Sequence, residues 1–401
     1  MTHRQNTPAR ALPGALLLAG ILLIAANLRA PITGLAPVLA MIQADFGLGT
    51  VQAGILTTLP LLAFALLSPV APLLAQRIGL ERALLAALVL IGGGVAIRSA
   101  GPVACLYGGT ALIGAGIAVG NVLLPSLLKR DFPARIAPVT SAFALTTGLA
   151  AAITSYTVFP LASRYGLGWP GALAAVLVLP VAALAVWWPQ LGRPAGAPPA
   201  AASARGRPIW RSALAWQVTL FMGFNSFIYY VMIGWLPSIL TSSGHSAAQA
   251  GSLHGAMQLA SALPGLLLGA IVPRLKDQRA VALGASLLLS LAFFGLLRLP
   301  AWAALWVACF GFGSGACIIL SLSFMGLRTH SPAQAAALSG MAQSVGYLLA
   351  ASGPPLIGLL RDTSGGWGLP LALCLALTLL IAVLGTLAGR DARVPDADRP
   401  G

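Results

Sequence analysis

Residues 13–40 read PGALLLAGILLIAANLRAPITGLAPVLA, a run of 28 positions with a single charged side chain, Arg29. About 20 consecutive apolar residues cross the roughly 30 Å hydrocarbon core of a bilayer as an α-helix. The run is therefore long enough to span a membrane. Arg4 and Arg10 precede it, as they would in a signal peptide, but the run is too long for one and no cleavage signal follows. We expect a helix that the protein retains.

The rest of the chain has the same character. Its 401 residues include only 23 Lys or Arg and 8 Asp or Glu, whereas 58% are hydrophobic and the mean hydropathy is +0.90. A soluble domain has about 25% charged residues. The composition therefore disfavours soluble domains, a disordered chain and a disulfide scaffold. The four cysteines all lie in apolar segments, where no disulfide framework is expected.

Eleven further apolar runs follow the first, each near the roughly 17 to 25 residues that a spanning helix requires. We predict an all-α membrane protein with twelve transmembrane helices, at residues 13–40, 50–74, 82–99, 102–127, 137–161, 169–188, 213–240, 248–272, 280–298, 301–325, 334–359 and 368–388. An even number of crossings places both termini on the same side of the membrane.

The positive charges are distributed unevenly between the two sides. The termini and alternate loops carry 18 of the 23 Lys and Arg residues; the opposite loops carry only Arg98, Arg164, Arg298 and Arg361. Because cytoplasmic loops are enriched in Lys and Arg, we predict a multi-pass inner-membrane protein with both termini in the cytoplasm. The net charge of +15 then reflects topology, and no nucleic-acid partner is expected.

The longest break in hydrophobicity is residues 189–212, rich in Pro, Ala, Gly and Arg. This composition favours a cytoplasmic linker. It divides the chain into two predicted six-helix bundles, residues 1–188 and 213–401, the second with a short cytoplasmic tail. Matching residues recur in order at offsets of 197 to 200, including Gln52 with Gln249, Arg77 with Arg274, Arg98 with Arg298, Gly114 with Gly313 and Gly116 with Gly315. The fold is therefore predicted to be a pseudo-symmetric tandem repeat.

A parallel repeat of six helices resembles the arrangement of major facilitator transporters. Residues 74–82, LAQRIGLER, are similar to the conserved loop between helices two and three of that superfamily. Gln76 stands where the family usually has Asp, and Leu80–Glu81 replaces a basic pair. The resemblance implies that Arg77, Gly79 and Arg82 belong to a gating loop.

More specific strings resemble the cyanate permease and nitroimidazole transporter family. They are NLRAP at residues 27–31, GNVLLP at 120–125 followed by KRDFP at 129–133, YY at 229–230 with WLP at 235–237, and QSVGY at 343–347. The resemblance extends over about residues 13–388. It implies transport of a small anionic or polar nitrogen-containing solute, and leaves cyanate, nitrate-like ions and nitroaromatics open.

Arg29 is the most informative single residue, because it lies near the middle of the first predicted helix. An Arg at that depth costs roughly 2.5 to 3.5 kcal/mol on insertion scales. A guanidinium facing a cavity would be a fixed counter-charge for an anion, with planar donors suited to cyanate, nitrate or a carboxylate. The alternative is an Arg that reaches an interface or satisfies backbone carbonyls.

The positions of the acidic residues also favour an anionic substrate. All eight Asp and Glu map to predicted loops or to the tail, which disfavours organic cations and divalent metals as substrates. No metal site or cofactor is expected. His254, in the eighth predicted helix, is the candidate for proton coupling, with Gln258 four residues on to orient its ring. The alternative for His254 is a hydrogen-bonded packing residue.

Further candidates for substrate binding are polar or aromatic residues within the predicted helices, where such groups point inward. The resemblance implies that the cavity is lined by helices one, two, four, five, seven, eight, ten and eleven. The candidates are Asn27, Thr33, Thr57, Asn121, Asn225, Tyr229, Tyr230, Gln343 and Tyr347. Hydrogen bonds between helices are the alternative role for each. Pro31, Pro37 and Gly353–Pro354–Pro355 are expected to interrupt their helices, either for gating or as packing kinks.

We therefore predict a monomeric secondary transporter that moves a small, anionic or polar nitrogenous molecule across the lipid bilayer by alternating access. A proton-coupled exporter of drug-like compounds is the alternative. An enzyme is disfavoured because GxSxG, phosphate-loop and HExxH motifs are absent from the sequence. A channel is disfavoured because no repeated filter loop or charged ring is present.

Overall fold

The computed structural model describes residues 14–68, 70–132, 135–192 and 209–395, and the regular secondary structure of this part of the chain is entirely helical. Its main helices are α1 (Gly14–Asn27), α2 (Ala30–Thr33), α3 (Leu39–Phe46), α4 (Thr50–Leu67), α5 (Val70–Ile78), α6 (Leu80–Arg98), α7 (Val103–Asp131), α8 (Ile136–Ser163), α9 (Gly168–Ala174), α10 (Val178–Trp187), α11 (Ala213–Ser242), α12 (Ala247–Ile271), α13 (Arg279–Arg298), α14 (Ala303–Leu327), α15 (Pro332–Ser364) and α16 (Gly368–Ala388). The all-α prediction is confirmed.

Ten spans are long and apolar enough to cross a membrane within the described residues. The two other predicted helices, at 248–272 and 334–359, are present as α12 and α15, with 25 and 33 residues. Both helices line the interior of the protein, as described below, so polar side chains are expected on them.

The first predicted helix is broken rather than continuous. It consists of α1, α2, the 3-10 turn Ala36–Val38 and α3. Pro31 has no N–H to donate to the carbonyl of Asn27, and a residue before proline is disfavoured in the α conformation. The helix therefore ends at Asn27 and restarts at Ala30, which leaves Arg29 in the break with φ −127° and ψ −45°.

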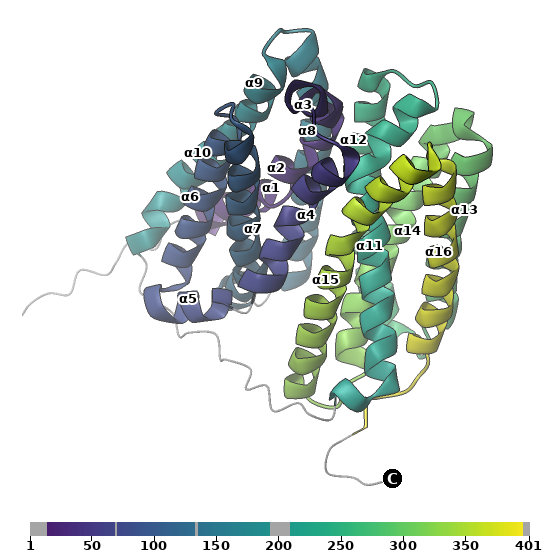
Figure 1. Ribbon diagram of the computed structural model, residues 1–401. Helices are drawn as coiled ribbons and strands as arrows, with labels where there is room; N and C mark the ends of the chain where they lie inside the picture. Colours follow the sequence, from purple (N-terminus) through teal and green to yellow (C-terminus); the bar gives the residue numbers. More distant parts are fainter. Residues whose placement is uncertain (1–13, 69, 133–134, 193–208, 396–401) are drawn as a thin grey trace, which may run out of the picture.

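The second predicted helix and the loop after it also differ from expectation. α4 ends at Leu67, and α5 runs from Val70 to Ile78 across the lower end of the first half (Figure 1). Only Gly79, with φ +89°, separates α5 from α6. Glycine tolerates this left-handed backbone, which other residues rarely adopt. The predicted gating loop is thus two helix ends joined by one residue.

Several charged residues assigned to loops lie in helices. Asp45 is in α3, Glu81 in the first turn of α6, Asp131 at the end of α7 and Asp362 in α15. All four are near helix ends, because the helices extend beyond their apolar runs. Arg98, also assigned to a loop, is the last residue of α6 and is only 1% exposed. Arg29 is therefore not the only cation inside the helical body.

The helices form two six-helix groups, as the tandem repeat predicts. In Figure 1, α1 to α10 lie on one side and α11 to α16 on the other, with α8 facing α12 and α4 facing α15. α11 is the most enclosed span, with 83% of its apolar window buried. Large exposed apolar side chains on the outside, such as Leu66, Val178 and Trp302, suit contact with lipid. Residues 193–208 of the predicted linker lie outside the described residues.

Glycine contacts correct one detail of the repeat. A Cβ on Gly114 would approach Pro60 of α4 to 2.6 Å, and one on Gly116 would approach Ala87 of α6 to 2.5 Å. In the second half, Gly311 meets Met257 of α12 and Gly313 meets Ala285 of α13 in the same way. The structural partner of Gly114 is therefore Gly311, and that of Gly116 is Gly313. The pairing of Gly114 with Gly313, and of Gly116 with Gly315, was wrong by two residues.

Candidate functional site

Arg29 lies at the centre of the site, in the break between α1 and α2. Its Nη1 donates to the hydroxyl of Tyr229 on α11 and lies 3.5 Å from Oε1 of Gln258 on α12. Its Cζ is 5.0 Å from the centroid of the Tyr229 ring. The Tyr229 hydroxyl in turn donates to Gln258 Oε1 at 2.8 Å. A cation from the first half is thus held by two side chains of the second half.

A cavity of about 110 Å³ opens beside this guanidinium. Arg29, Asn225, Ser226, Tyr229, Tyr230, Ser261, Ser314, Gly315, Ile318 and Tyr347 line it. The residues come from the break in the first span and from α11, α12, α14 and α15. Arg29 is the only charged residue among them, and none of the described carboxylates lies within ion-pair distance of it. The cavity therefore presents one positive charge surrounded by neutral polar groups.

Asn225 and Ser314 form another part of the cavity wall. Asn225 Nδ2 donates to the carbonyl oxygen of Ser314 at 3.3 Å, and Ser314 Oγ donates to Asn225 Oδ1 at 3.1 Å. This pairing fixes the amide orientation between α11 and α14. Tyr230 packs edge-on against Tyr229, with ring centroids 5.5 Å apart. Four of the sequence candidates, Asn225, Tyr229, Tyr230 and Tyr347, thus share the cavity with Arg29.

A second cavity, of about 220 Å³, adjoins the first through Tyr347. Phe64, Ser68, Ala118, Asn121, Val122, Pro125, Gln343 and Tyr347 line it. Two further candidates, Asn121 and Gln343, are therefore on this side of the site. Gln343 Nε2 donates to Ser339 Oγ at 2.8 Å, and the Tyr347 ring meets Phe64 edge-on at 5.8 Å.

Three candidates from the first two predicted helices lie outside both of these cavities. Asn27 is buried and donates to the Leu23 carbonyl of its own helix at 2.8 Å. Thr33 is buried and donates to the carbonyl of Ala151, which fixes α2 against α8. Thr57 donates to the Gly54 carbonyl and lines a separate small cavity beside Arg98. These hydroxyls and amides satisfy backbone carbonyls near the helix break and at the helix contacts.

His254 and Gln258 are both fully buried on α12 but have different neighbours. Gln258 belongs to the Arg29 and Tyr229 cluster. His254 instead places Nδ1 3.1 Å from Ser155 Oγ on α8, and its Nε2 has no partner within the described residues. His254 therefore lies at the contact between the two halves, outside the cavity wall.

The predicted gating residues lie away from this site. Arg77 and Arg82 are exposed, on α5 and α6. A partly buried ion pair of the region instead joins Glu81 to Arg130 of α7 at 2.5 Å, with Asp131 at 3.0 Å from the same nitrogen. Although burial lowers the pKa of Arg130, the hydrogen bonds with Asp131 and Glu81 outweigh it and the pKa is raised. The sequence interpretation emphasised Arg77 and Arg82 and missed Arg130.

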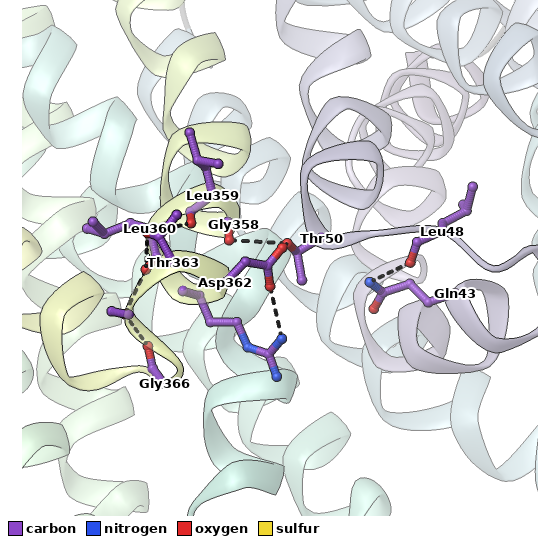
Figure 2. A network of polar contacts seen from close by, with 11 residues as sticks. Gln43, Leu48, Thr50, Gly358, Leu359, Leu360, Asp362, Thr363 and Gly366 are labelled. Carbon is purple, nitrogen blue, oxygen red and sulfur yellow. Dashed lines mark hydrogen bonds and ion pairs between the residues drawn. The ribbon is translucent and has the colours of Figure 1, made fainter.

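At the opposite end, polar contacts close the two halves against each other (Figure 2). Thr50, the first residue of α4, donates to the Asp362 carboxylate and to the Gly358 carbonyl of α15, the latter at 3.1 Å. Arg361 Nη1 donates to Asp362 Oδ1 at 3.1 Å. Further along, Thr58 donates to the Ala351 carbonyl at 2.8 Å. Pro355 has no N–H for that carbonyl, so the proline supplies an acceptor for the opposite half.

Sequence reasoning missed the hydroxyls of Ser226, Ser261 and Ser314. Ser226 lies four residues before Tyr230 and Ser261 three residues after Gln258, so helical spacing could have indicated both. Ser314 had no such signal. The sequence analysis also missed Thr50 and Asp362, because both lie at the edges of apolar runs.

A polar cavity enclosed between two helical halves in a lipid-facing body defines the class of this protein as a membrane transporter. The chain belongs to the major facilitator superfamily, since residues 17–351 match that family. It is 55% identical to the 2-nitroimidazole transporter of Escherichia coli (strain K12) over 379 residues, 94% of this chain and 96% of that protein. It is 29% identical to the cyanate transport protein CynX of the same organism over 357 residues, 86% and 90% of the two chains.

Among solved structures, the fold resembles a bacterial homologue of the human lysosomal transporter Spinster. The TM-score is 0.74 at 16% identity, with coverage of 96% of this chain and 97% of that chain. The predicted resemblance to the cyanate permease and nitroimidazole transporter family is confirmed. The protein is a non-enzymatic, multi-pass membrane transporter of a small molecule.

Proposed function

We propose that this protein transports a small delocalised monoanion, with Arg29 as the counter-charge in the binding site. The observation that carries the proposal is the cavity beside Arg29, which is lined by hydroxyl and amide groups and by no carboxylate among its described lining residues. A partly buried cation without an acidic partner attracts an anion, because water screens it less than it would screen an exposed charge. The planar guanidinium matches planar, delocalised charge.

The relatives' named solutes have this chemistry in common. Cyanate is a delocalised monoanion, and 2-nitroimidazole is a weak acid whose ring N–H ionises to give one. The 55% identity with the 2-nitroimidazole transporter supports a nitrogen-containing solute of this kind. Nitrate-like ions belong to the same chemical class.

The size of the cavity favours a small solute over the drug-like alternative. Pockets that enclose drug-sized ligands are typically about 300–1,000 Å³. The Arg29 cavity is about 110 Å³. A drug-sized compound would have to displace Tyr347 and occupy the adjoining cavity as well.

Alternating access is the proposed mechanism. Thr50–Asp362, Thr58–Ala351 and His254–Ser155 hold the halves together on one side of Arg29, whereas the cavity at Asn121 and Gln343 lies on the other. The positive-inside distribution supports placing the Asn121 side and both termini in the cytoplasm. Rocking of the halves would break the first set of contacts and close the second side. His254 is the proposed proton-coupling residue, because its hydrogen bond crosses the moving contact.

Uptake into proteoliposomes tests the substrate class. Cyanate, nitrate, 2-nitroimidazole and its N-methylated analogue, which cannot form the anion, are compared at one pH. We expect saturable uptake of 2-nitroimidazole, stimulated by the same unlabelled solute on the far side, and little uptake of the methylated analogue. Equal transport of the ionisable and methylated compounds would show that the substrate is neutral.

A further inference from the structure

Arg98 is a buried cation, distinct from the partly buried Arg29 and its site. It is 1% exposed at the end of α6, and its Nη1 donates to the Pro31 carbonyl at 2.6 Å. That carbonyl is free because the N–H of Leu35 bonds to Ile32 instead. The Nε and Nη2 of Arg98 have no partner within the described residues. One carbonyl satisfies only part of a buried guanidinium, and unsatisfied buried charge is costly.

Arg98 borders a small cavity of about 10 Å³. Ile32, Thr57 and Thr110 of the first half form part of its wall, and Ile233 of α11 closes it from the second half. A volume of this size holds about one water molecule. The cavity is therefore a narrow space at the contact between the halves, and its size depends on the position of α11.

The helix positions place this cavity on the Thr50–Asp362 side of Arg29. Pro31 is two residues beyond Arg29, and Arg98 ends α6 at the same end of the molecule as the Thr50–Asp362 contact. Thr57 is seven residues, or about 10 Å, along α4 from Thr50. Arg98 thus lies between the Arg29 cavity and the closed face, which is the face defined by Thr50, Gly358 and Asp362.

We propose that Arg98 forms a second anion-binding position, which the solute occupies when α11 withdraws from α4 and the closed face opens. This inference rests on the proposed function and takes the same ligand class, a small delocalised monoanion. Nε and Nη2 form one edge of the guanidinium, the geometry that binds two acceptor atoms in parallel. Solute arriving from the closed face meets Arg98 first and Arg29 second, whereas solute from the other side reaches Arg29 directly.

The sidedness of this arrangement distinguishes a binding role from a purely structural one. Saturation curves for labelled 2-nitroimidazole are measured in right-side-out and inside-out membrane vesicles containing wild type, Arg98→Gln or Arg98→Lys. Arg298→Gln is the matched control, because Arg298 is the exposed repeat counterpart at the end of α13.

We expect Arg98→Gln to raise the half-saturation concentration about tenfold for uptake from the closed face and to leave the opposite direction within about twofold. Arg98→Lys keeps the charge without the fork and should give a smaller shift with the same sidedness. If Arg98→Gln does not fold, the half-saturation concentrations of Arg98→Lys in the two directions provide the test. An equal change in both directions, or none in either, would overturn the proposal. If the proposed function itself is wrong, the outcome differs: the Arg29→Ala variant would then transport 2-nitroimidazole normally from both sides.

Discussion

Arg29 is positioned by groups that belong to the other half of the molecule. Its guanidinium meets the Tyr229 hydroxyl, and Gln258 accepts from both. Hydrogen bonds to charged groups contribute roughly 1.5–3 kcal/mol. Because the link spans the two halves, any movement between them changes the orientation of the cation that the solute meets.

Tyr229→Phe tests this link. The change removes the hydroxyl but keeps the ring beside Arg29, so we expect the half-saturation concentration for 2-nitroimidazole to rise about tenfold or more, as about 1.4 kcal/mol corresponds to a factor of ten. Tyr230→Phe is the control, since Tyr230 lines the same cavity but Tyr229 carries the contact to Arg29. An equal effect of the two substitutions would argue against the link.

His254 offers a second test at the scale of one side chain. Its bond to Ser155 joins α12 to α8 across the moving contact. We expect an imposed pH gradient to change the initial rate of uptake by wild type and to have no effect on His254→Asn, because Asn keeps a polar side chain but has no titratable group. Ser155→Ala is the companion variant. A gradient without effect on wild type would rule out proton coupling.

Single residues were predictable where composition made them exceptional. Arg29 was identified because a cation in a long apolar run is costly, and Tyr229 because it lies within a family motif. The serine hydroxyls were not, because Ser in a membrane helix commonly bonds to its own backbone and sequence does not give the rotation of the helix. Arg98 was missed because a charge at the end of an apolar run resembles a loop residue.

At the scale of helices, α4 and α15 form the closing contact. A Cβ on Gly54 would lie 2.7 Å from the Pro355 Cα and 2.8 Å from the Pro354 carbonyl oxygen. Both are backbone atoms that cannot move aside as a flexible side chain would. Glycine at this position is therefore required for the two helices to pack as closely as they do.

Gly54→Ala should force α4 and α15 apart and shift the population away from the closed face. The measurement is the distance between spin labels at positions 40 and 363, in a background where the four cysteines are replaced. We expect a longer-distance population to increase relative to wild type. Gly93→Ala is the control, because a Cβ at Gly93 meets nothing within 4 Å. An unchanged distribution in Gly54→Ala would contradict the assignment of this contact as the gate.

Helix breaks were only partly predictable. Pro31 was expected to interrupt the first span, and the interruption there determines where Arg29 lies. The division of the second predicted helix into α4 and α5 was not expected, because hydropathy records which residues tolerate lipid and not where the chain turns. The same limitation explains why residues 74–82 were interpreted as a loop.

At the scale of the whole molecule, periodic apolar runs and the tandem repeat were sufficient to predict twelve helices in two groups. Burial in lipid requires long apolar helices, so number and order follow directly from sequence. The correct repeat offset near Gly114 could be identified only from the contacts that Gly311 and Gly313 make in the structure. The boundary between halves, at 189–212, stays a prediction.

Orientation in the membrane is a property of the whole chain and can be measured separately. We expect a protease to remove a C-terminal tag in inside-out vesicles and to leave it intact in right-side-out vesicles, because Lys and Arg gather on the side of both termini. A cysteine introduced at Thr363, on the opposite side, should react with an impermeant thiol reagent in right-side-out vesicles only. The reverse pattern would invert the proposed topology.

The central claim is that Arg29 binds the charge of the solute. The most direct test is equilibrium binding of 2-nitroimidazole to purified protein, measured by calorimetry at a pH above the pKa of the solute. Wild type is compared with Arg29→Ala and Arg298→Ala. We expect wild type and Arg298→Ala to bind alike, and Arg29→Ala to bind at least about a hundredfold more weakly, which corresponds to loss of a charge-assisted bidentate contact of about 2.7 kcal/mol or more. Equal affinity of folded Arg29→Ala and wild type would contradict the account.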